Sequence, residues 1–270
     1  MSSRFIARLF PFKQPAILLL SYPRSGSSWI GKVLSTSPDI AYLREPVNQA
    51  FLNKFNEGAI IDPYRDDKTL KWYTQFADQA FIGIPPKNVA YLIENTDDFS
   101  LFRRHTTNIL IKDVNPLSAG LYVQRYSPKV VYIVRHPAAV AASFTKMGWI
   151  SVSYEDFGYM YGAHTAQAID AVEDGWYIVI VYEDFALDPL IQFKALFSSI
   201  GIAPPDDLEK LTSEYSEGEY SSDDPYEIRR SSCYEADKWK KILSQTQIDD
   251  VLKGCRRSGL RRDLMDSIVQ

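Results

Sequence analysis

The sequence predicts an α/β fold with three layers, in which helices cover both sides of a central, mainly parallel sheet. Short apolar runs rich in strand-forming residues alternate with helical stretches, as in chains that join parallel strands through crossover helices. Two of these runs, 130–134 and 177–182, are apolar on both faces, which is typical of central strands covered by helices on each side. A length of 270 residues, 46% of them hydrophobic, fits one such domain with insertions over 1–270.

The apolar runs define six expected strands and the stretches between them define five expected helices. The strands are 16–21, 40–44, 90–93, 109–112, 130–134 and 177–182. The helices are 27–36, 115–126, 137–147, 189–199 and 238–256. In the last helix, Trp239, Leu243 and Leu252 belong to one apolar stripe with spacings of three and four, which indicates packing against the core.

Two segments interrupt the alternation of strands and helices. Residues 51–88 are rich in aromatics and contain three prolines, so we expect an insertion between the second and third strands. Residues 206–228 collect acidic side chains with serines and tyrosines and lose apolar periodicity, which predicts a surface loop or lid.

Charge and composition exclude several classes of protein. Thirty Lys and Arg against 34 Asp and Glu give a net charge of −4, so no overall positive field attracts a nucleic acid. The longest apolar runs fall short of the about 18 residues of a membrane-spanning helix. The run 16–20 follows basic residues but is too short for a secretory signal and lacks a cleavage site, so we expect a cytoplasmic protein. Cys233 and Cys255 are expected to be reduced thiols.

The most informative segment follows the first predicted strand. Pro23 fixes one backbone angle, Gly26 can adopt a positive φ, and Ser27 or Ser28 can cap the next helix, so several amides converge at a helix N-terminus. An arginine in the same turn adds a forked cation for an oxyanion. The candidate anion-binding residues are Pro23, Arg24, Ser25, Gly26, Ser27, Ser28 and Trp29.

Residues 26–32 also match the glycine and lysine spacing of the nucleoside-triphosphate P-loop. We reject this match because Val33 stands where that loop needs a Mg²⁺-binding hydroxyl, and because Trp29 and Ile30 are too bulky to wrap a phosphate. Gly31 is expected to lie already within the helix. Two functions stay open as alternatives for a chain with such an anion-binding segment: an ATP-dependent kinase and a catalytically inactive nucleotide-binding protein.

A second motif follows the strand predicted at 130–134. Arg135 stands at the carboxyl end of this strand, where open α/β sheets bind ligands, and Pro137 suits the first position of a helix. Ser143 then falls about two turns into that helix, so both side chains can grip one phosphate. By itself, an arginine at a strand end also fits a structural ion pair. His136 is expected to cap the helix or to pack there.

Together, the two motifs resemble those of the sulfotransferases that use 3′-phosphoadenosine 5′-phosphosulfate (PAPS). The resemblance extends to 182–185 and to the Trp239 helix, and it spans about 16–255. It implies a P-loop-like fold with PAPS as donor and 3′-phosphoadenosine 5′-phosphate (PAP) as product. It further implies that the loop cradles the 5′-phosphosulfate and that Arg135 and Ser143 bind the 3′-phosphate. The motif style is similar to that of the carbohydrate and tyrosyl-protein branches and of bacterial relatives.

The same resemblance assigns candidate catalytic residues. Arg24 stands where relatives carry Arg or Lys and would neutralise charge on the 5′-phosphate side. Lys112 resembles the lysine before aspartate that faces the transferring group in the carbohydrate and tyrosyl-protein branches. The cytosolic small-molecule branch uses a histidine as base, but Val114 occupies that position here.

Glu45 instead resembles the glutamate that other branches place after the second strand. We expect Pro46 to hold Glu45 in an extended conformation and to aim it as the general base. A carboxylate is a weak base near pH 7 unless burial raises its pKa. An ion pair with Arg44 or Arg24 is the alternative role for Glu45.

The remaining expectations concern adenine, metals and the acceptor. Arg230 and Ser231 stand near the place where relatives contact adenine and ribose. No Cys and His spacing indicates zinc and no carboxylate pair requires Mg²⁺, so we expect no metal. We expect a small-molecule acceptor that is polar, either cationic or a glycan, held by aromatics and carboxylates, although a merely solvated acidic surface explains the same residues. The residues that define the acceptor are expected in four irregular segments, 51–88, 94–108, 148–165 and 206–228.

Overall fold

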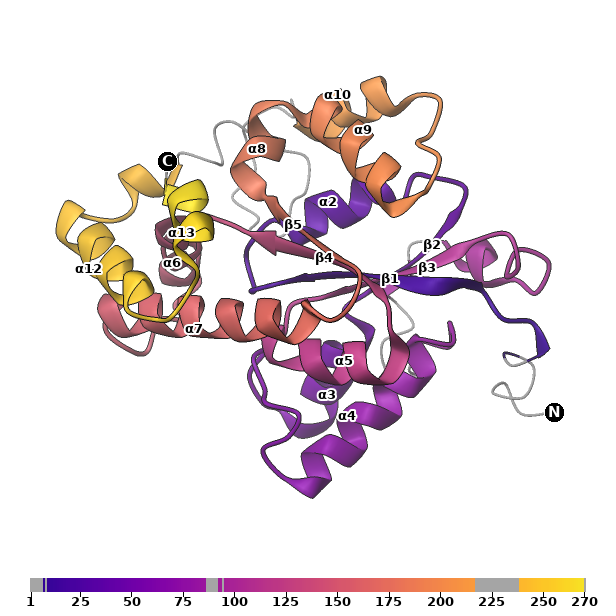
Figure 1. Ribbon diagram of the computed structural model, residues 1–270, viewed down its shortest axis with the longest axis horizontal. Coiled ribbons are helices and arrows are strands. Elements are labelled where there is room, and N and C mark those ends of the chain that lie inside the picture. Colours follow the sequence, from indigo (N-terminus) through magenta and orange to yellow (C-terminus); the bar gives the residue numbers. More distant parts are fainter. Residues whose placement is uncertain (1–6, 8, 86–91, 94, 217–237, 270) are drawn as a thin grey trace.

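The computed structural model describes residues 7, 9–85, 92–93, 95–216 and 238–269. Within this part of the chain, a five-stranded parallel sheet with strand order β2-β3-β1-β4-β5 forms the centre of the molecule (Figure 1). This confirms the predicted α/β fold. The strands are β1 (Lys13–Ser21), β2 (Ile40–Arg44), β3 (Asn108–Asp113), β4 (Lys129–Val134) and β5 (Tyr177–Val181).

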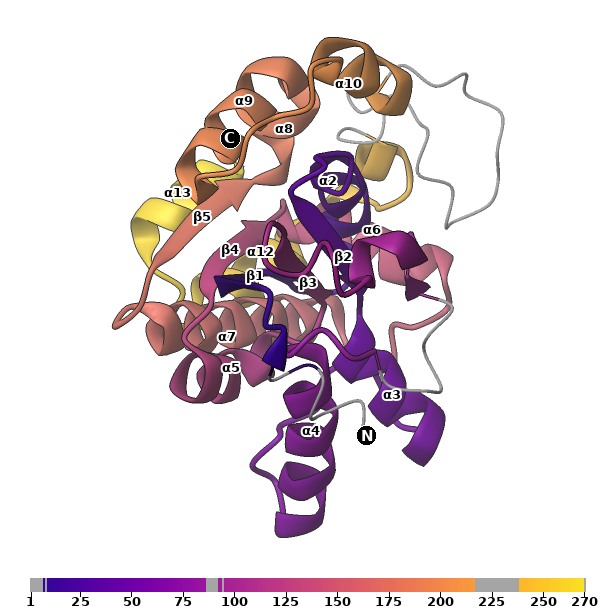
Figure 2. The same ribbon diagram turned by 90° about the vertical axis from the view of Figure 1, so that its right-hand side faces the viewer.

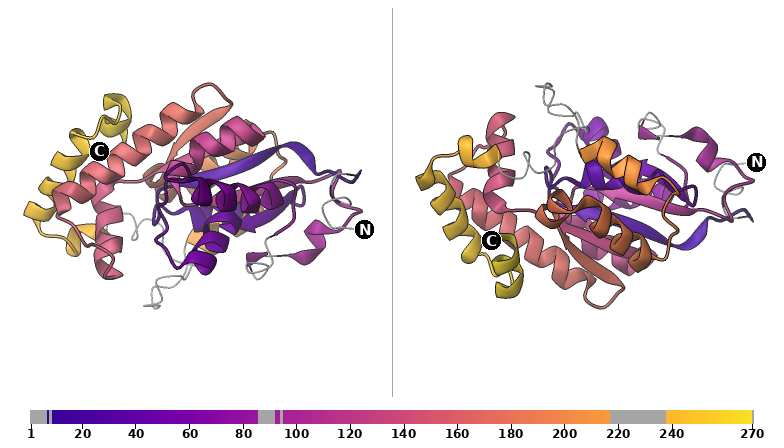
Figure 3. Two further views of the ribbon diagram at one scale, coloured as in Figure 1. Left: turned by 90° about the horizontal axis from the view of Figure 1, so that it is seen from below. Right: turned by 90° about the horizontal axis from the view of Figure 1, so that it is seen from above.

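Helices cover both faces of the sheet and give the expected three layers, which Figure 2 shows from the side. One face carries α2 (Ser27–Leu34), α8 (Tyr182–Leu187), α9 (Pro189–Ile200) and α10 (Leu208–Ser216). The other carries α3 (Pro46–Phe55), α4 (Asp67–Ala80), α5 (Ala119–Tyr126) and α7 (Tyr154–Val172). At one end of the molecule, α6 (Pro137–Lys146), α12 (Gln245–Arg256) and α13 (Arg262–Val269) gather beside α7 (Figure 3).

The core is divided by the sheet because successive side chains of a strand point to opposite faces. In β1, Ile17 and Leu19 pack beneath α2 and α9, whereas Leu18 and Leu20 pack toward the other helical layer. All four side chains are fully buried. The first strand therefore reaches the phosphate loop as a rigid central element.

Two strand predictions were wrong in part. The run predicted as the central strand 177–182 is the edge strand β5, and Tyr182 already begins α8. Its residues are apolar because Ile178 and Ile180 pack in the core layer that contains α9 and Val179 and Val181 in the layer that contains α7, although among the described residues only β4 pairs with it. In the predicted strand 90–93, the first two residues lie outside the described part, and Ile93 makes only an isolated antiparallel bridge with Leu43.

Four of the five predicted helices are confirmed, the segment 115–126 beginning with a 3-10 turn, η3 (Pro116–Ser118). The helix predicted over 238–256 is instead divided into η4 (Lys238–Lys241) and α12. The division occurs at Ser244, whose side chain accepts from the amide of Gln247 while the Gln247 side chain accepts from the amide of Ser244. This capping box starts a new helix.

The segments expected to be irregular contain several helices. The insertion 51–88 is largely the α3–α4 hairpin. Residues 148–165 include the first part of α7, so the expectation that this segment is irregular was wrong. Of the acidic segment 206–228, the part described is mostly the helix α10, and the remainder lies outside the described residues. Residues 95–107 do lack long elements and hold only the short turn η2 (Thr96–Phe99). Cys255 is a buried free thiol, and Cys233 lies outside the described part.

Among the described residues, no helix combines the length and the apolar character that crossing a membrane requires.

Candidate active site

The loop between β1 and α2 has the conformation of an anion-binding turn. Arg24 and Gly26 both adopt positive φ, 70° and 88°, and α2 begins directly afterwards. The amides of Gly26, Ser27 and Ser28 precede the first intrahelical hydrogen bonds and point out of the helix N-terminus. These amides provide donors for an oxyanion.

Glycine is required at the start of α2 by both conformation and space. A Cβ atom on Gly26 would collide with the ring of Tyr182. The cap predicted at Ser27 or Ser28 was wrong, because Gly26 holds the cap position and no side chain caps it. Ser27 instead accepts a hydrogen bond from the hydroxyl of Ser21 at 2.9 Å, so it fastens the loop to the end of β1.

The other loop residues lie mostly below the surface. The hydroxyl of Ser25 is fully buried and has no hydrogen-bond partner, which is unusual unless an absent group completes it. Trp29 packs edge-on against Tyr182 and Phe193, with ring centroids at 5.8 and 5.6 Å. Trp29 therefore supports the loop from inside. Pro23, near the start of the loop, is also buried.

The structure supports the rejection of the nucleoside-triphosphate motif. Gly31 lies inside α2, where a Cβ atom would meet the hydroxyl of Tyr42 at 2.5 Å. Val33 is fully buried in the core. The glycine spacing thus arises from helix packing and not from a phosphate-wrapping loop.

Arg24, within the loop, contacts both residues of the second motif, Arg135 and Ser143. Nε of Arg24 donates to the hydroxyl of Ser143 at 2.9 Å, and the guanidinium of Arg135 donates to the carbonyl of Arg24 at 3.1 Å. The guanidinium of Arg135 also lies over the ring of Tyr182, 4.2 Å from its centre. The hydroxyl of Tyr161 donates to the Arg135 carbonyl at 2.6 Å, which fixes the backbone there. The loop is therefore linked through Arg24 to both the strand end that carries Arg135 and the helix that carries Ser143.

His136 has the capping and packing role expected for it. Its Nδ1 accepts from the amide of Ala138 at the start of α6, and its ring stacks on Trp239 with centroids 4.2 Å apart. Its amide donates to the carboxylate of Glu183 at 3.0 Å. Burial raises the pKa of Glu183, and the charge of Arg135 opposes that shift. These contacts hold the late Trp239 segment against the strand end that carries Arg135.

Lys112 and Glu45 form a buried ion pair at the ends of β3 and β2. The ammonium of Lys112 bonds the carboxylate of Glu45 and lies 3.3 Å from the hydroxyl of Ser28 on α2. The side chains are 2% and 18% exposed. Gln49, one helical turn after Glu45, donates to its other carboxylate oxygen at 2.9 Å. The pair is thus linked to the phosphate loop through α2.

Two expectations for Glu45 were wrong. Its backbone is left-handed, with φ 53° and ψ 42°, and not extended, because it is the cap residue of α3 and its amide donates to the Lys112 carbonyl. Its partner is Lys112, and not Arg44 or Arg24. Burial favours a higher pKa of Glu45, but the charge and hydrogen bond of Lys112, aided by Gln49, hold that pKa below its ordinary value.

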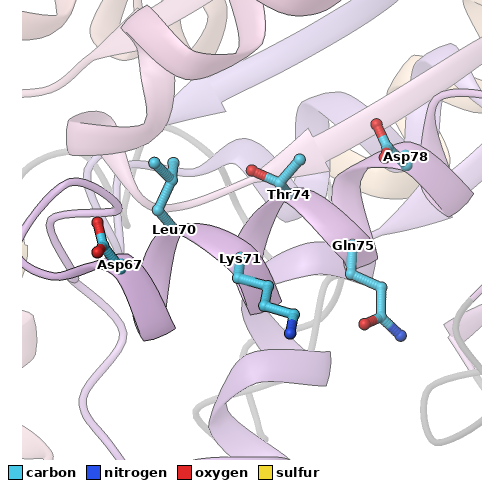
Figure 4. A pocket seen from close by; sticks show the side chains of 6 residues that line it. All are labelled: Asp67, Leu70, Lys71, Thr74, Gln75 and Asp78. Carbon is cyan, nitrogen blue, oxygen red and sulfur yellow. The ribbon is translucent and has the colours of Figure 1, made fainter.

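Other expected features lie elsewhere. Arg230 and Ser231 are outside the described residues. Within the described ranges, no group of three His, Cys, Asp or Glu side chains is placed to hold a metal ion. A surface hollow of about 520 Å³ runs along α4 (Figure 4) and contains no candidate site residue, so it does not mark the donor site. Its lining residues are Asp67, Leu70, Lys71, Thr74, Gln75 and Asp78.

Comparison with known proteins decides the family. The chain matches the sulfotransferase family over residues 15–206, which include the phosphate loop, Glu45, Lys112, Arg135 and Ser143. The chain belongs to the sulfotransferase family. The resemblance inferred from its motifs is thereby confirmed. No curated protein matches the chain in sequence.

Solved structures similar to this sulfotransferase include other sulfotransferases of low sequence identity. The sulfotransferase domain of the Synechococcus PCC 7002 olefin synthase is 18% identical, with 91% of this chain and 94% of that chain covered and a TM-score of 0.48. Mouse sulfotransferase SULT7A1 complexed with PAP is 14% identical, with 99% of this chain and 93% of that chain covered and a TM-score of 0.49. A sulfotransferase from Alicyclobacillus acidocaldarius is 16% identical, with 94% of this chain and 99% of that chain covered and a TM-score of 0.45.

Several residues of the site were missed from the sequence of this sulfotransferase. Tyr161 and Tyr182 fix Arg135, and Gln49 binds Glu45. Gln49 follows Glu45 by four residues, a spacing that places both on one helix face and that the sequence does contain. The tyrosines come from distant elements, so no local signal connects them with Arg135.

Proposed function

We propose that this sulfotransferase moves a sulfuryl group from PAPS to a hydroxyl or amine of a small polar acceptor, with Glu45 as general base. The observation that carries the proposal is the convergence of Arg24, Arg135 and Ser143 beside the loop at the N-terminus of α2. The same helix bears Ser28, which contacts the Lys112–Glu45 pair. An anion site and a proton acceptor are thus joined by one element.

The donor has two groups of negative charge, and the chain offers two sets of ligands. The loop amides and the buried Ser25 hydroxyl suit the 5′-phosphosulfate, since a helix N-terminus favours anions. Arg135 and Ser143 suit the 3′-phosphate, with Tyr182 and Tyr161 holding Arg135 in place. Residues Arg230 and Ser231 stay candidates for adenine and ribose.

The transfer needs positioned cations and a proton acceptor more than covalent help from the protein. The acceptor oxygen or nitrogen forms a bond to sulfur while the bond from sulfur to the 5′-phosphate oxygen breaks, so PAP leaves with added negative charge. Arg24 and Lys112 neutralise that charge. Glu45 takes the proton that the acceptor loses.

The ion pair explains how Glu45 serves as a base despite its lowered pKa. Because Lys112 holds it ionised at neutral pH, Glu45 is in the form that can accept a proton. Its affinity for a proton is low while Lys112 remains at the carboxylate. When Lys112 turns toward the charge that develops on the transferring group, this affinity rises at the moment when the acceptor releases its proton.

The acceptor is proposed to be a small polar molecule, cationic or a glycan. The region after β2 supports this, because the α3–α4 hairpin, which follows Glu45 directly, carries several aromatic side chains. A panel of amine-bearing, glycan and phenolic acceptors tests the class, with faster turnover expected for the first two. Equal turnover of all three would contradict the proposal.

Ligand-induced thermal stabilisation tests the donor. A ligand that binds only the native state raises the free energy of unfolding by mass action, by about 2.7 kcal/mol at a hundredfold excess over Kd, and so raises the melting temperature. We expect this with PAP and not with ATP and Mg²⁺. Stabilisation by ATP and Mg²⁺ alone would favour a kinase, and PAP binding without sulfuryl transfer from PAPS would favour an inactive binder.

A further inference from the structure

The end of β3 carries a second acidic residue that the proposed reaction does not use. Lys112 and Asp113 are consecutive, so their side chains point to opposite faces of the sheet. Lys112 faces Ser28 on α2, whereas Asp113 faces Tyr122 on α5. Asp113 is fully buried and accepts hydrogen bonds from the Tyr122 hydroxyl at 2.5 Å and from the Val114 amide at 2.8 Å.

The contacts of Asp113 continue into the α3–α4 hairpin. The Tyr122 hydroxyl lies 3.5 Å from that of Tyr73 on α4, which accepts from the side-chain amide of Asn115 at 3.0 Å. Asn115 also binds both the amide and the carbonyl of Ile61, at 3.3 and 2.7 Å. The hairpin that begins at Glu45 is therefore fastened to the strand end that carries Lys112 by a buried polar network.

Stability alone gives little reason to bury a carboxylate here. Burial of an ionisable group lowers the free energy of unfolding by several kcal/mol unless its partners compensate, and replacement by apolar residues is often neutral or stabilising. Tyr122 from α5 and Tyr73 from α4 face Asp113, and the charges of Lys112 on its own strand and of Glu45 before α3 act on it from the other face of the sheet. Burial raises the pKa of Asp113 to about 7, and the charge of Glu45 adds to this, while the Tyr122 hydrogen bond opposes it. The amide of Glu45 donates to the carbonyl of Lys112, so Glu45 lies beside the peptide that joins Lys112 to Asp113, and its charge can act on Asp113.

We propose that Asp113 is a positioning residue behind the Lys112–Glu45 pair, where its ionisation, controlled by Tyr122, strengthens Glu45 as the proton acceptor. The inference rests on the proposed function. An anion at Asp113 disfavours a second anion at Glu45, so proton transfer to Glu45 becomes more favourable. The rate of transfer therefore rises as Asp113 loses its proton.

The coupling is tested first without any enzyme assay. Carbon-13 NMR of labelled aspartate carboxyl groups gives the titration midpoint of Asp113, assigned by its loss in Asp113→Asn. We expect the midpoint to rise in Tyr122→Phe, which removes the stabilising hydrogen bond, and to fall in Glu45→Gln, which removes the neighbouring anion. The matched control is Tyr126→Phe, one turn later on α5, where the hydroxyl binds Asp78. A midpoint that stays the same in Glu45→Gln would overturn the inference.

The pH dependence of turnover then connects the coupling to the reaction. In the wild type, a plot of kcat against pH is expected to rise in a step at the titration midpoint of Asp113. In Tyr122→Phe the step is expected at a higher pH, and in Asp113→Asn it is expected to be absent. The KM for PAPS is expected to stay constant, since Asp113 faces away from the phosphate loop. A purely structural role would lower kcat without moving the step, so an unmoved step in Tyr122→Phe refutes the inference. Absence of any transfer by the wild type would overturn the proposed function itself.

Discussion

At the scale of the residue, Glu45 carries the most specific mechanistic claim. Glu45→Gln keeps the size and one hydrogen-bond acceptor of the side chain but cannot accept the acceptor's proton. We expect kcat to fall about 10²- to 10⁴-fold, the usual contribution of a general base, with PAP affinity preserved. Steady-state kinetics and calorimetry measure the two quantities. Glu57→Gln is the control, because Glu57 is a partly exposed glutamate paired with Arg65. Unchanged turnover in Glu45→Gln would remove Glu45 as the base.

Arg135 offers a test of donor binding. Arg135→Ala removes charged hydrogen bonds worth about 1.5–3 kcal/mol each, so PAP affinity is expected to fall at least about 10-fold. Titration calorimetry with PAP measures this. Arg125→Ala serves as the control because Arg125 pairs with Asp78 on the surface of α5. Equal affinity of Arg135→Ala and the wild type would refute the assignment of the 3′-phosphate site.

How much of the site the sequence predicts depends on the range of the interactions. Arg135 and Ser143 were predicted to act together because the end of a strand and the helix that follows it face one edge of the sheet, whereas their contacts with Arg24 were not predicted. The Lys112–Glu45 pair was not predicted as a pair, because it requires β2 and β3 to be neighbours, which strand order alone decides. The left-handed backbone of Glu45 likewise results from capping α3 and overrides the preference of a residue before proline.

At the scale of the element, the crossing of α7 and α12 depends on glycine. A Cβ atom on Gly158 would collide with the carbonyl of Val251, and one on Gly254 with the carbonyl of Glu155. Because both obstacles are backbone, Gly158→Ala is expected to lower the free energy of unfolding by about 1–3 kcal/mol. Urea denaturation measures the change.

The control for this crossing is Gly120→Ala in α5, where an added Cβ meets only Ala171 at 3.7 Å. Alanine is the better helix former, so this variant is expected to be stabilised by up to about 1 kcal/mol. A Gly158→Ala protein as stable as the wild type would show that the two helices separate easily.

The same glycines explain why α7 was missed from the sequence. Its buried positions recur at helical spacing, but Gly158, Gly162 and Thr165 occupy three of them, so no continuous apolar stripe is visible. Small residues there serve the close approach of α12, which is a tertiary requirement. In contrast, α2 and α6 follow strands, α9 follows α8, and all three begin near serine or proline signals that the sequence contains, so they were predicted.

At the scale of the whole molecule, the sheet joins catalysis to stability. The carboxyl ends of β1, β2, β3 and β4 supply the loop, Glu45, Lys112 and Arg135 to one edge. Concentrating charge there requires buried ionisable groups, of which Asp113 is fully enclosed. Asp113 therefore contributes to the pH dependence of the free energy of unfolding, in a direction that its raised pKa sets.

Because burial raises the pKa of Asp113 from 3.8 to about 7, the folded state binds its proton more tightly than the unfolded state. Its contribution to stability is complete below pH 4, is lost as the pH rises through 7, and amounts to at most about 4 kcal/mol at about 1.4 kcal/mol per pKa unit. Asp113→Asn lacks this titration, so the stability difference between wild type and variant is expected to shift against the wild type between pH 4 and 7 and then to level off. Urea denaturation across this range measures it, with Asp249→Asn on the exposed face of α12 as the control. A difference independent of pH would mean that Asp113 is ionised throughout, with Tyr122 and Lys112 compensating for its burial.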